Sequence, residues 1–126
     1  MSSKATKITL WVVCVLLALE FAFAGIPKLM GQSDAVQGFR QAGFPDGFRL
    51  FIGAAEVSGA LGLLLPRLRF WAATGLSIIM IGALVTHVRA HDTLAKMAPA
   101  AISLVLLVLI AWTSRPRRAA CDAQRI

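Results

Sequence analysis

The sequence predicts an all-α protein, a transmembrane four-helix up-down bundle with a short amphipathic helix in the first outer loop. Three observations support this fold class. Four apolar segments fit within the 126 residues, and each is close to the about 20 residues that cross a bilayer core. Only 15% of the residues are charged and 58% are hydrophobic, which is too little charge to cover a soluble surface. Short connections join the last three segments, so neighbouring helices should run antiparallel.

A soluble helical bundle is the alternative to a membrane protein. It would need polar residues every three or four positions on one face of each helix. The run ISLVLLVLIAW at 102–112 has one serine and no charged residue. The hydropathy pattern therefore predicts one membrane domain over 1–126. Its predicted spans are 8–30, 48–65, 70–89 and 94–113.

The first span also has features of a secretory signal peptide. Lys4 and Lys7 precede the apolar run, and an A-x-A sequence lies at 22–24. Glu20 interrupts the approach to that sequence, so we expect a retained helix. Pro27 removes a backbone donor near the end of the span and is expected to bend it there.

The connection 31–47 is the longest in the chain and predicts a short helix of its own. Ser33 or Asp34 can cap that helix. Gly43 suits the left-handed position after a helix, and Pro45 prevents its continuation. We expect this amphipathic helix to lie at the outer interface, where it would cover the bundle.

Small residues four positions apart indicate where helices approach closely, because backbone proximity drives helix packing in lipid. The small-residue pairs are Ala18 with Ala22, Ala55 with Gly59, and Ser58 with Gly62.

Asp46 lies just before the second span, and we expect its side chain to cap that helix.

The charge distribution predicts the orientation of the chain. Eight basic residues and one acidic residue lie at the N-terminus, in the second connection and in the basic tail 114–126, against five basic and three acidic residues on the other side. The positive-inside rule then places both termini in the cytoplasm, for a multi-pass protein of the cytoplasmic (inner) membrane. The net charge of +7 alone would suggest nucleic acid, but its basic residues are concentrated on the predicted inner side of the membrane. The predicted partner is therefore the lipid bilayer and not nucleic acid.

Ionisable residues at membrane depth are the most informative, because a charge at the bilayer centre costs at least about 2.5–3.5 kcal/mol. Glu20 lies near the middle of the first span and Glu56 lies within the second. Helical side chains lean toward their own N-terminus. We therefore expect Lys28, Glu56 and His87 to converge in the outer half of the bundle. Thr86 would be a further hydrogen-bonding neighbour.

This convergence has several interpretations. One interpretation gives the Lys28–Glu56 pair a purely structural role, in which it locks the first two spans together. A second gives it a role in a ligand or proton site. Alternatively, Lys28 snorkels to the interface beside a protonated Glu56. Glu20 can stay neutral, face Thr74 or Ser77 across the bundle, or face a partner protein.

The sequence predicts no metal, haem or catalytic centre. His87 and His91 share a helix face near Asp92, which makes half a metal site, but a helix end at the interface explains both. Haem usually needs axial ligands from two helices, so it is not expected. No nucleotide-binding or nucleophile motif is present. Cys14 and Cys121 form no C-x-x-C pair.

Four segments of the sequence carry a family resemblance. They are FAFAGIPKL at 21–29, GFP at 43–45, GAAEVSGALGLLLP at 53–66 and MIGALVTH at 80–87. Together they resemble the DoxX-like family of small four-helix membrane proteins. The recurrent polar positions of that family fall on Lys28, Glu56, Thr86 and His87. Glu20 is not part of the family pattern.

The resemblance implies a membrane subunit associated with redox chemistry. The family name comes from a subunit linked to thiosulfate:quinone oxidoreductase, and other relatives are described as parts of redox-stress complexes or as assembly factors. We expect a non-catalytic or weakly catalytic accessory subunit, with no assigned catalytic residue, that holds a small lipophilic or quinone-like head group. Lys28 or His87 would donate to a carbonyl oxygen, and Glu56 would orient Lys28.

Two other functions remain open from the sequence. One is a structural or assembly subunit that docks other membrane redox subunits or forms a homo-oligomer. The other is a proton or small-solute carrier that uses Glu20 and Glu56.

Overall fold

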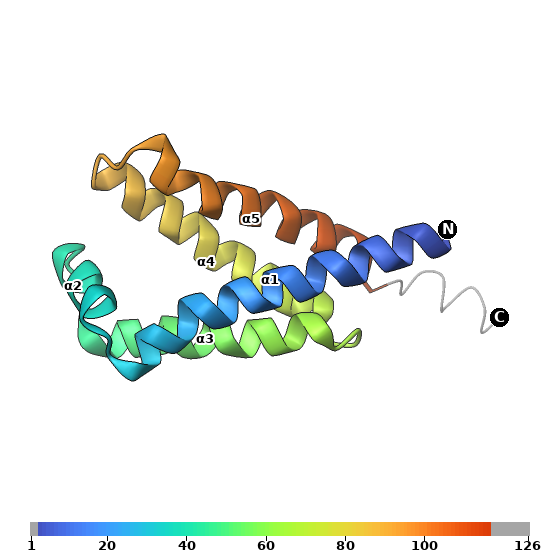
Figure 1. The fold of residues 1–126 in the computed structure, drawn as a ribbon, viewed down its shortest axis with the longest axis horizontal. Coiled ribbons are helices and arrows are strands. Elements are labelled where there is room, and N and C mark those ends of the chain that lie inside the picture. Colours follow the sequence, from blue (N-terminus) through green and yellow to red (C-terminus); the bar gives the residue numbers. More distant parts are fainter. Residues whose placement is uncertain (1–2, 117–126) are drawn as a thin grey trace.

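Five helices make up most of residues 3–116, the part of the chain that the structure describes (Figure 1). The structure is a computed structural model. The helices are α1 Lys4–Met30, α2 Ser33–Gln41, α3 Asp46–Leu64, α4 Arg69–Arg89 and α5 Leu94–Ser114. All except α2 are long and apolar enough to cross a membrane. The predicted all-α bundle with four spans and a short helix in the first loop is therefore confirmed. Most of the predicted tail lies outside the described residues.

The helix ends follow from local capping. The side chain of Ser3 accepts a hydrogen bond from the backbone N–H of Thr6 at 3.1 Å, so α1 begins earlier than predicted. Thr93 caps α5 in the same way. Gly43 has a φ of 86°, the left-handed conformation that the sequence predicted for it after α2.

Asp46 does not cap α3, which corrects the sequence-based prediction. Pro45 occupies the N-cap position, and Asp46 is the first residue of the helix. Its carboxylate accepts a hydrogen bond from Arg40 of α2 at 3.1 Å. That hydrogen bond and the charge of Asp46 raise the pKa of Arg40. Asp46 still favours the start of α3 through the helix dipole.

The four long helices form two closely packed pairs. α1 packs along α3, α4 packs along α5, and α3 joins the pairs by contacting α4. The hydrophobic core lies at the N-terminal end of the bundle, where α1 begins, the α3–α4 turn lies and α5 ends (Figure 1). Its largest fully buried side chains are Phe21, Leu63, Leu76 and Leu107.

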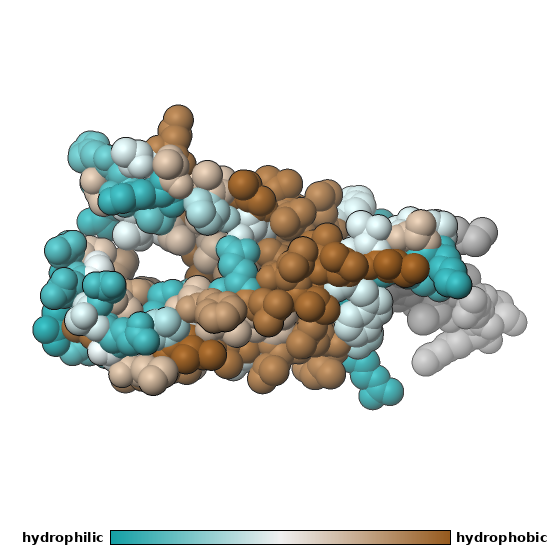
Figure 2. Space-filling model, in the orientation of Figure 1, coloured by the Kyte–Doolittle hydropathy of each residue, from teal (hydrophilic) through white to brown (hydrophobic). Residues whose placement is uncertain are grey.

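The two helix pairs separate toward the other end, which we call the α2 end. Buried residues there come only from α1 and α3, because α4 has none after Met80 and α5 has none before Ala100. Figure 2 shows an opening in the surface between the α4–α5 turn and the α1–α2 side. Within the described chain, α2 contacts α1 and α3 but neither α4 nor α5. α2 lies at this end of the bundle (Figure 1), and its role as a cover stays a prediction.

The surface is that of a membrane protein. Hydrophobic side chains cover the middle of the molecule and hydrophilic ones gather at its two ends (Figure 2). Trp11, Trp71 and Trp112 are exposed near the N-terminal end. Arg69 lies 4.6 Å above the ring of Trp11, and Arg115 lies 3.9 Å above that of Trp112. Aromatic residues at this level are typical of a membrane interface.

Candidate functional site

Lys28 and Glu56 form a buried ion pair between α1 and α3. The Nζ atom of Lys28 lies 3.0 Å from Oε1 and 2.9 Å from Oε2 of Glu56. It also donates to the backbone oxygen of Ala24 at 3.0 Å. The side chains are only 18% and 4% exposed. Because an ammonium group has three donors, these three contacts satisfy the hydrogen-bonding capacity of Lys28.

The ion pair forms where the backbones of α1 and α3 touch at two glycines. A Cβ atom added to Gly25 would lie 2.8 Å from the backbone oxygen of Gly53, and one added to Gly53 would lie 2.9 Å from Cβ of Lys28. Only glycine permits this approach. The small-residue pairs proposed from the sequence did not include these two positions. Gly59 and Gly62, which they did include, face α4 side chains, which added Cβ atoms would meet at 2.7 and 2.8 Å.

Arg49 is a second buried cation at the site, and from the sequence it counted only among the five basic residues of the outer side. It is 7% exposed, and its Nη1 donates to the backbone oxygen of Lys28 in the last turn of α1. Carbonyls at a helix C-terminus lack partners within the helix, and a cation there complements the helix dipole. Arg49 and Glu56 are seven residues apart and so share one face of α3, which is the signal that the sequence offered.

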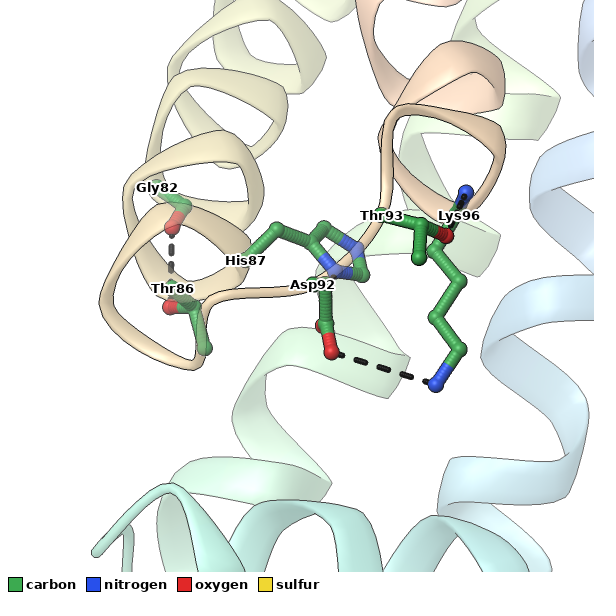
Figure 3. A network of polar contacts seen from close by, with 6 residues as sticks. All are labelled: Gly82, Thr86, His87, Asp92, Thr93 and Lys96. Atoms are coloured by element: carbon green, nitrogen blue, oxygen red, sulfur yellow. Dashed lines mark hydrogen bonds and ion pairs between the residues drawn. The ribbon is translucent and has the colours of Figure 1, made fainter.

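Thr86 and His87 form their hydrogen bonds elsewhere. Thr86 donates to the backbone oxygen of Gly82 within α4 at 2.9 Å. Nδ1 of His87 lies 2.7 Å from Oδ2 of Asp92 in the α4–α5 turn. The second oxygen of Asp92 lies 3.8 Å from Nζ of Lys96, so the carboxylate sits between a histidine and a lysine (Figure 3). No hydrogen bond in residues 3–116 joins Thr86 or His87 to the ion pair. The close partner five residues away satisfies His87 locally.

The contact with Asp92 determines how His87 can interact. Nδ1 lies within hydrogen-bond distance of the carboxylate, so Asp92 occupies this ring nitrogen. The other ring nitrogen, Nε2, has no hydrogen-bond partner among the described residues. His91 does not share a helix face with His87, because α4 ends at Arg89 and His91 has a left-handed φ of 55°. No group of three His, Cys, Asp or Glu side chains that could hold a metal occurs in residues 3–116.

Glu20 lies on the exposed surface of α1. Its Oε1 accepts a hydrogen bond from the hydroxyl of Ser103 on α5 at 2.8 Å. The sequence had suggested Thr74 or Ser77 of α4 as partners, but these donate to carbonyls of their own helix at 2.8 and 2.7 Å. α1 meets α5 and not α4 on this side of the bundle, which explains the difference.

An open apolar groove lies between α4 and α5, away from the ion pair. Its volume is about 380 Å³. Apart from the arginine, its lining is apolar, which suits a lipid chain better than a polar head group. The lining residues are Ile81, Leu84, Val85, Val88, Arg89 and Leu104.

Four membrane-spanning helices and a buried Lys–Glu pair between two of them define a small polytopic membrane protein. A family model described as the DoxX-like family matches residues 12–111. The chain therefore belongs to the DoxX-like family. The matched segment contains Lys28, Glu56, Thr86 and His87. No curated protein matches the chain closely enough to serve as a relative.

Proposed function

We propose that this DoxX-like protein is an accessory membrane subunit of a redox or quinone-linked system that binds a small lipophilic or quinone-like head group at the α2 end. The observation that carries this proposal is the opening between the two helix pairs. Polar side chains lie on both pairs at that end, Lys28 and Glu56 on α1 and α3, and His87 and Asp92 on the α4–α5 hairpin. Apolar surroundings with a few placed polar groups are the usual composition of a small-molecule site.

His87 is the side chain best prepared to contact such a ligand. Asp92 orients the ring through Nδ1 and leaves Nε2 for the ligand. A protonated Nε2 would donate to a carbonyl oxygen, and a neutral one would accept from a hydroxyl group. Lys28 could donate only by exchanging one of its three existing hydrogen bonds. Its proposed role is therefore a positive charge beside the head group, oriented by Glu56.

The charges at the two ends support a cytoplasmic-membrane location with both termini inside. The basic residues described at the N-terminal end have no acidic neighbour at that end, whereas Asp34, Asp46 and Asp92 accompany the basic residues of the α2 end. The head group would then bind in the outer half of the bilayer. The described basic residues of the N-terminal end are Lys4, Lys7, Arg67, Arg69 and Arg115.

A structural or assembly role has support from a different observation. All three donors of Lys28 are used and the pair lies directly beside the Gly25–Gly53 contact, so the pair would lock α1 to α3 even without a ligand. A chain of this kind would dock a larger membrane complex without binding a small molecule. A carrier function has less support, because the core at the N-terminal end is formed by hydrophobic side chains.

Purification into lipid nanodiscs, followed by mass spectrometry of co-purifying small molecules and proteins, separates the two functions. The variant His87→Phe keeps a ring of similar size but removes both hydrogen-bonding nitrogens, and His91→Phe is its matched control in the adjoining turn. We expect a bound small molecule in the wild type and in His91→Phe and its loss in His87→Phe, with helix content unchanged by circular dichroism. Absence of any bound small molecule from the wild type, or its retention in His87→Phe, would contradict the proposed ligand site.

A further inference from the structure

Glu20 is a carboxyl group on the surface of the bundle, far from both ends of its helix. It is the 17th residue of the 27-residue helix Lys4–Met30. At 1.5 Å per residue it therefore lies about 24 Å from the start of α1 and about 15 Å from its end. A small hydrophilic patch interrupts the hydrophobic belt of the molecule in Figure 2. At this depth the side chain would meet lipid and not water.

The surroundings of Glu20 are apolar and exposed. Leu16, Leu19 and Phe23 lie within one turn of Glu20 on α1, and they are 61%, 52% and 77% exposed. Ile102, next to Ser103 on α5, is 61% exposed. None of these side chains can donate or accept a hydrogen bond. The face around Glu20 therefore offers the carboxyl group no further partner.

Ser103 satisfies only part of the carboxyl group. Its hydroxyl donates to Oε1, and Oε2 has no hydrogen-bond partner among residues 3–116. A neutral carboxyl group has one donor and further acceptor capacity, and an ionised one has about four acceptor sites. Unpartnered polar groups in hydrocarbon are costly, and ionisable residues in membrane spans pair with one another or with other polar groups. Residues 3–116 therefore leave Glu20 with unused hydrogen-bonding capacity, which a polar group of a neighbouring molecule can satisfy.

We propose that this face is the interface of a symmetric dimer, in which the Glu20 side chains of two copies meet. Two copies of one chain insert with the same orientation, so their symmetry axis runs along the membrane normal. Glu20 then lies at the same depth in both copies without any adjustment of register. A protonated carboxyl group is self-complementary, because each O–H can donate to the oxygen of the other. A different protein would need its own polar group at this depth.

The proposal is tested by the oligomeric state in lipid nanodiscs or bilayers, measured by single-molecule photobleaching. We expect the wild type to be dimeric and Glu20→Leu to associate at least about tenfold more weakly. Glu20→Gln should remain dimeric, because an amide also donates and accepts. Circular dichroism of the monomeric variant would verify that its helices are retained. A monomeric wild type, or a Glu20→Leu variant that dimerises as well as the wild type, would overturn the proposal.

Cross-linking tests the position of the interface independently. In a background with both native cysteines replaced by alanine, Phe23→Cys should form a disulfide-linked dimer on oxidation. Ile78→Cys is the control, because Ile78 is 65% exposed and lies in the middle of α4. Equal cross-linking of both variants would contradict a specific interface at Glu20. If the wild type instead co-purifies with another protein that Glu20→Leu loses, the dimer proposal would be overturned, because that protein and not a second copy would be the partner of Glu20.

Discussion

Removing one member of the Lys28–Glu56 ion pair should destabilise the protein more than replacing both members by apolar residues. Lys28→Met leaves the carboxyl group of Glu56, which is 4% exposed, without its partner. We expect a loss of about 3 kcal/mol in unfolding free energy, limited by the ability of the carboxyl group to take up a proton. Glu56→Leu should cost less, because the lysine side chain is 18% exposed and can extend toward the α2 end.

The double variant Lys28→Met/Glu56→Leu leaves no buried charge and keeps a similar side-chain volume. It should lie within about 1 kcal/mol of the wild type, far from the sum of the two single variants. The measurement is a double-mutant cycle on unfolding in mixed micelles, followed by helix content. Additive losses across the cycle would refute the reasoning, because they would show that the two charges do not depend on one another.

An exposed ion pair supplies the matched control for this cycle. Arg40 and Asp46 are connected at 3.1 Å, but their side chains are 64% and 49% exposed. Water screens such a pair and side-chain entropy opposes it. Alanine variants of Arg40 and Asp46 should therefore show no measurable coupling under the same conditions. Equal coupling in the two cycles would mean that burial does not set the strength of the Lys28–Glu56 pair.

Two further substitutions test the contacts that position the ion pair. Gly25→Ala would place Cβ 2.8 Å from a backbone oxygen of α3, so it should cost about 1–3 kcal/mol of unfolding free energy by forcing the helices apart. Gly82→Ala is the control, because an added Cβ there meets nothing within 4 Å, and it should be neutral or stabilising. Unfolding in mixed micelles measures both variants, and equal effects would contradict the close approach. Arg49→Met should lower stability by about 1–3 kcal/mol, because it removes the buried donor to the carbonyl of Lys28. Exposed Arg89→Met is the control, and an equal loss in both arginine variants would show that the contact contributes nothing specific.

The sequence predicted the helices because each span combines length with nearly unbroken hydrophobicity, a property that does not depend on tertiary contacts. It missed details that depend on competition between partners. Asp46 was expected to cap α3, but Arg40 binds its carboxylate and Pro45 occupies the capping position. The short helix in the first loop was correctly expected, yet nothing local indicated that it would contact only α1 and α3.

The site was partly predictable for the same reason. Lys28 and Glu56 could be paired in advance because insertion depth and the lean of helical side chains restrict which charges can meet. The partner of His87 could not be predicted in this way. Asp92 contacts His87 because α4 ends at Arg89, and the sequence did not show where that helix would end. Ser103 as the partner of Glu20 required knowing that α5, and not α4, lies beside α1 on that side.

The amino-acid sequence alone determined the number of candidate spans and their boundaries to within a few residues. These properties follow from transfer free energies and helix geometry, which act on one segment at a time. Only the tertiary structure decided that the helices pair as α1 with α3 and α4 with α5, that the pairs separate at the α2 end, and that Glu20 remains exposed. The close packing of α1 on α3 depends on how near their backbones approach, and the contact between Gly25 and Gly53, far apart in the sequence, permits that distance.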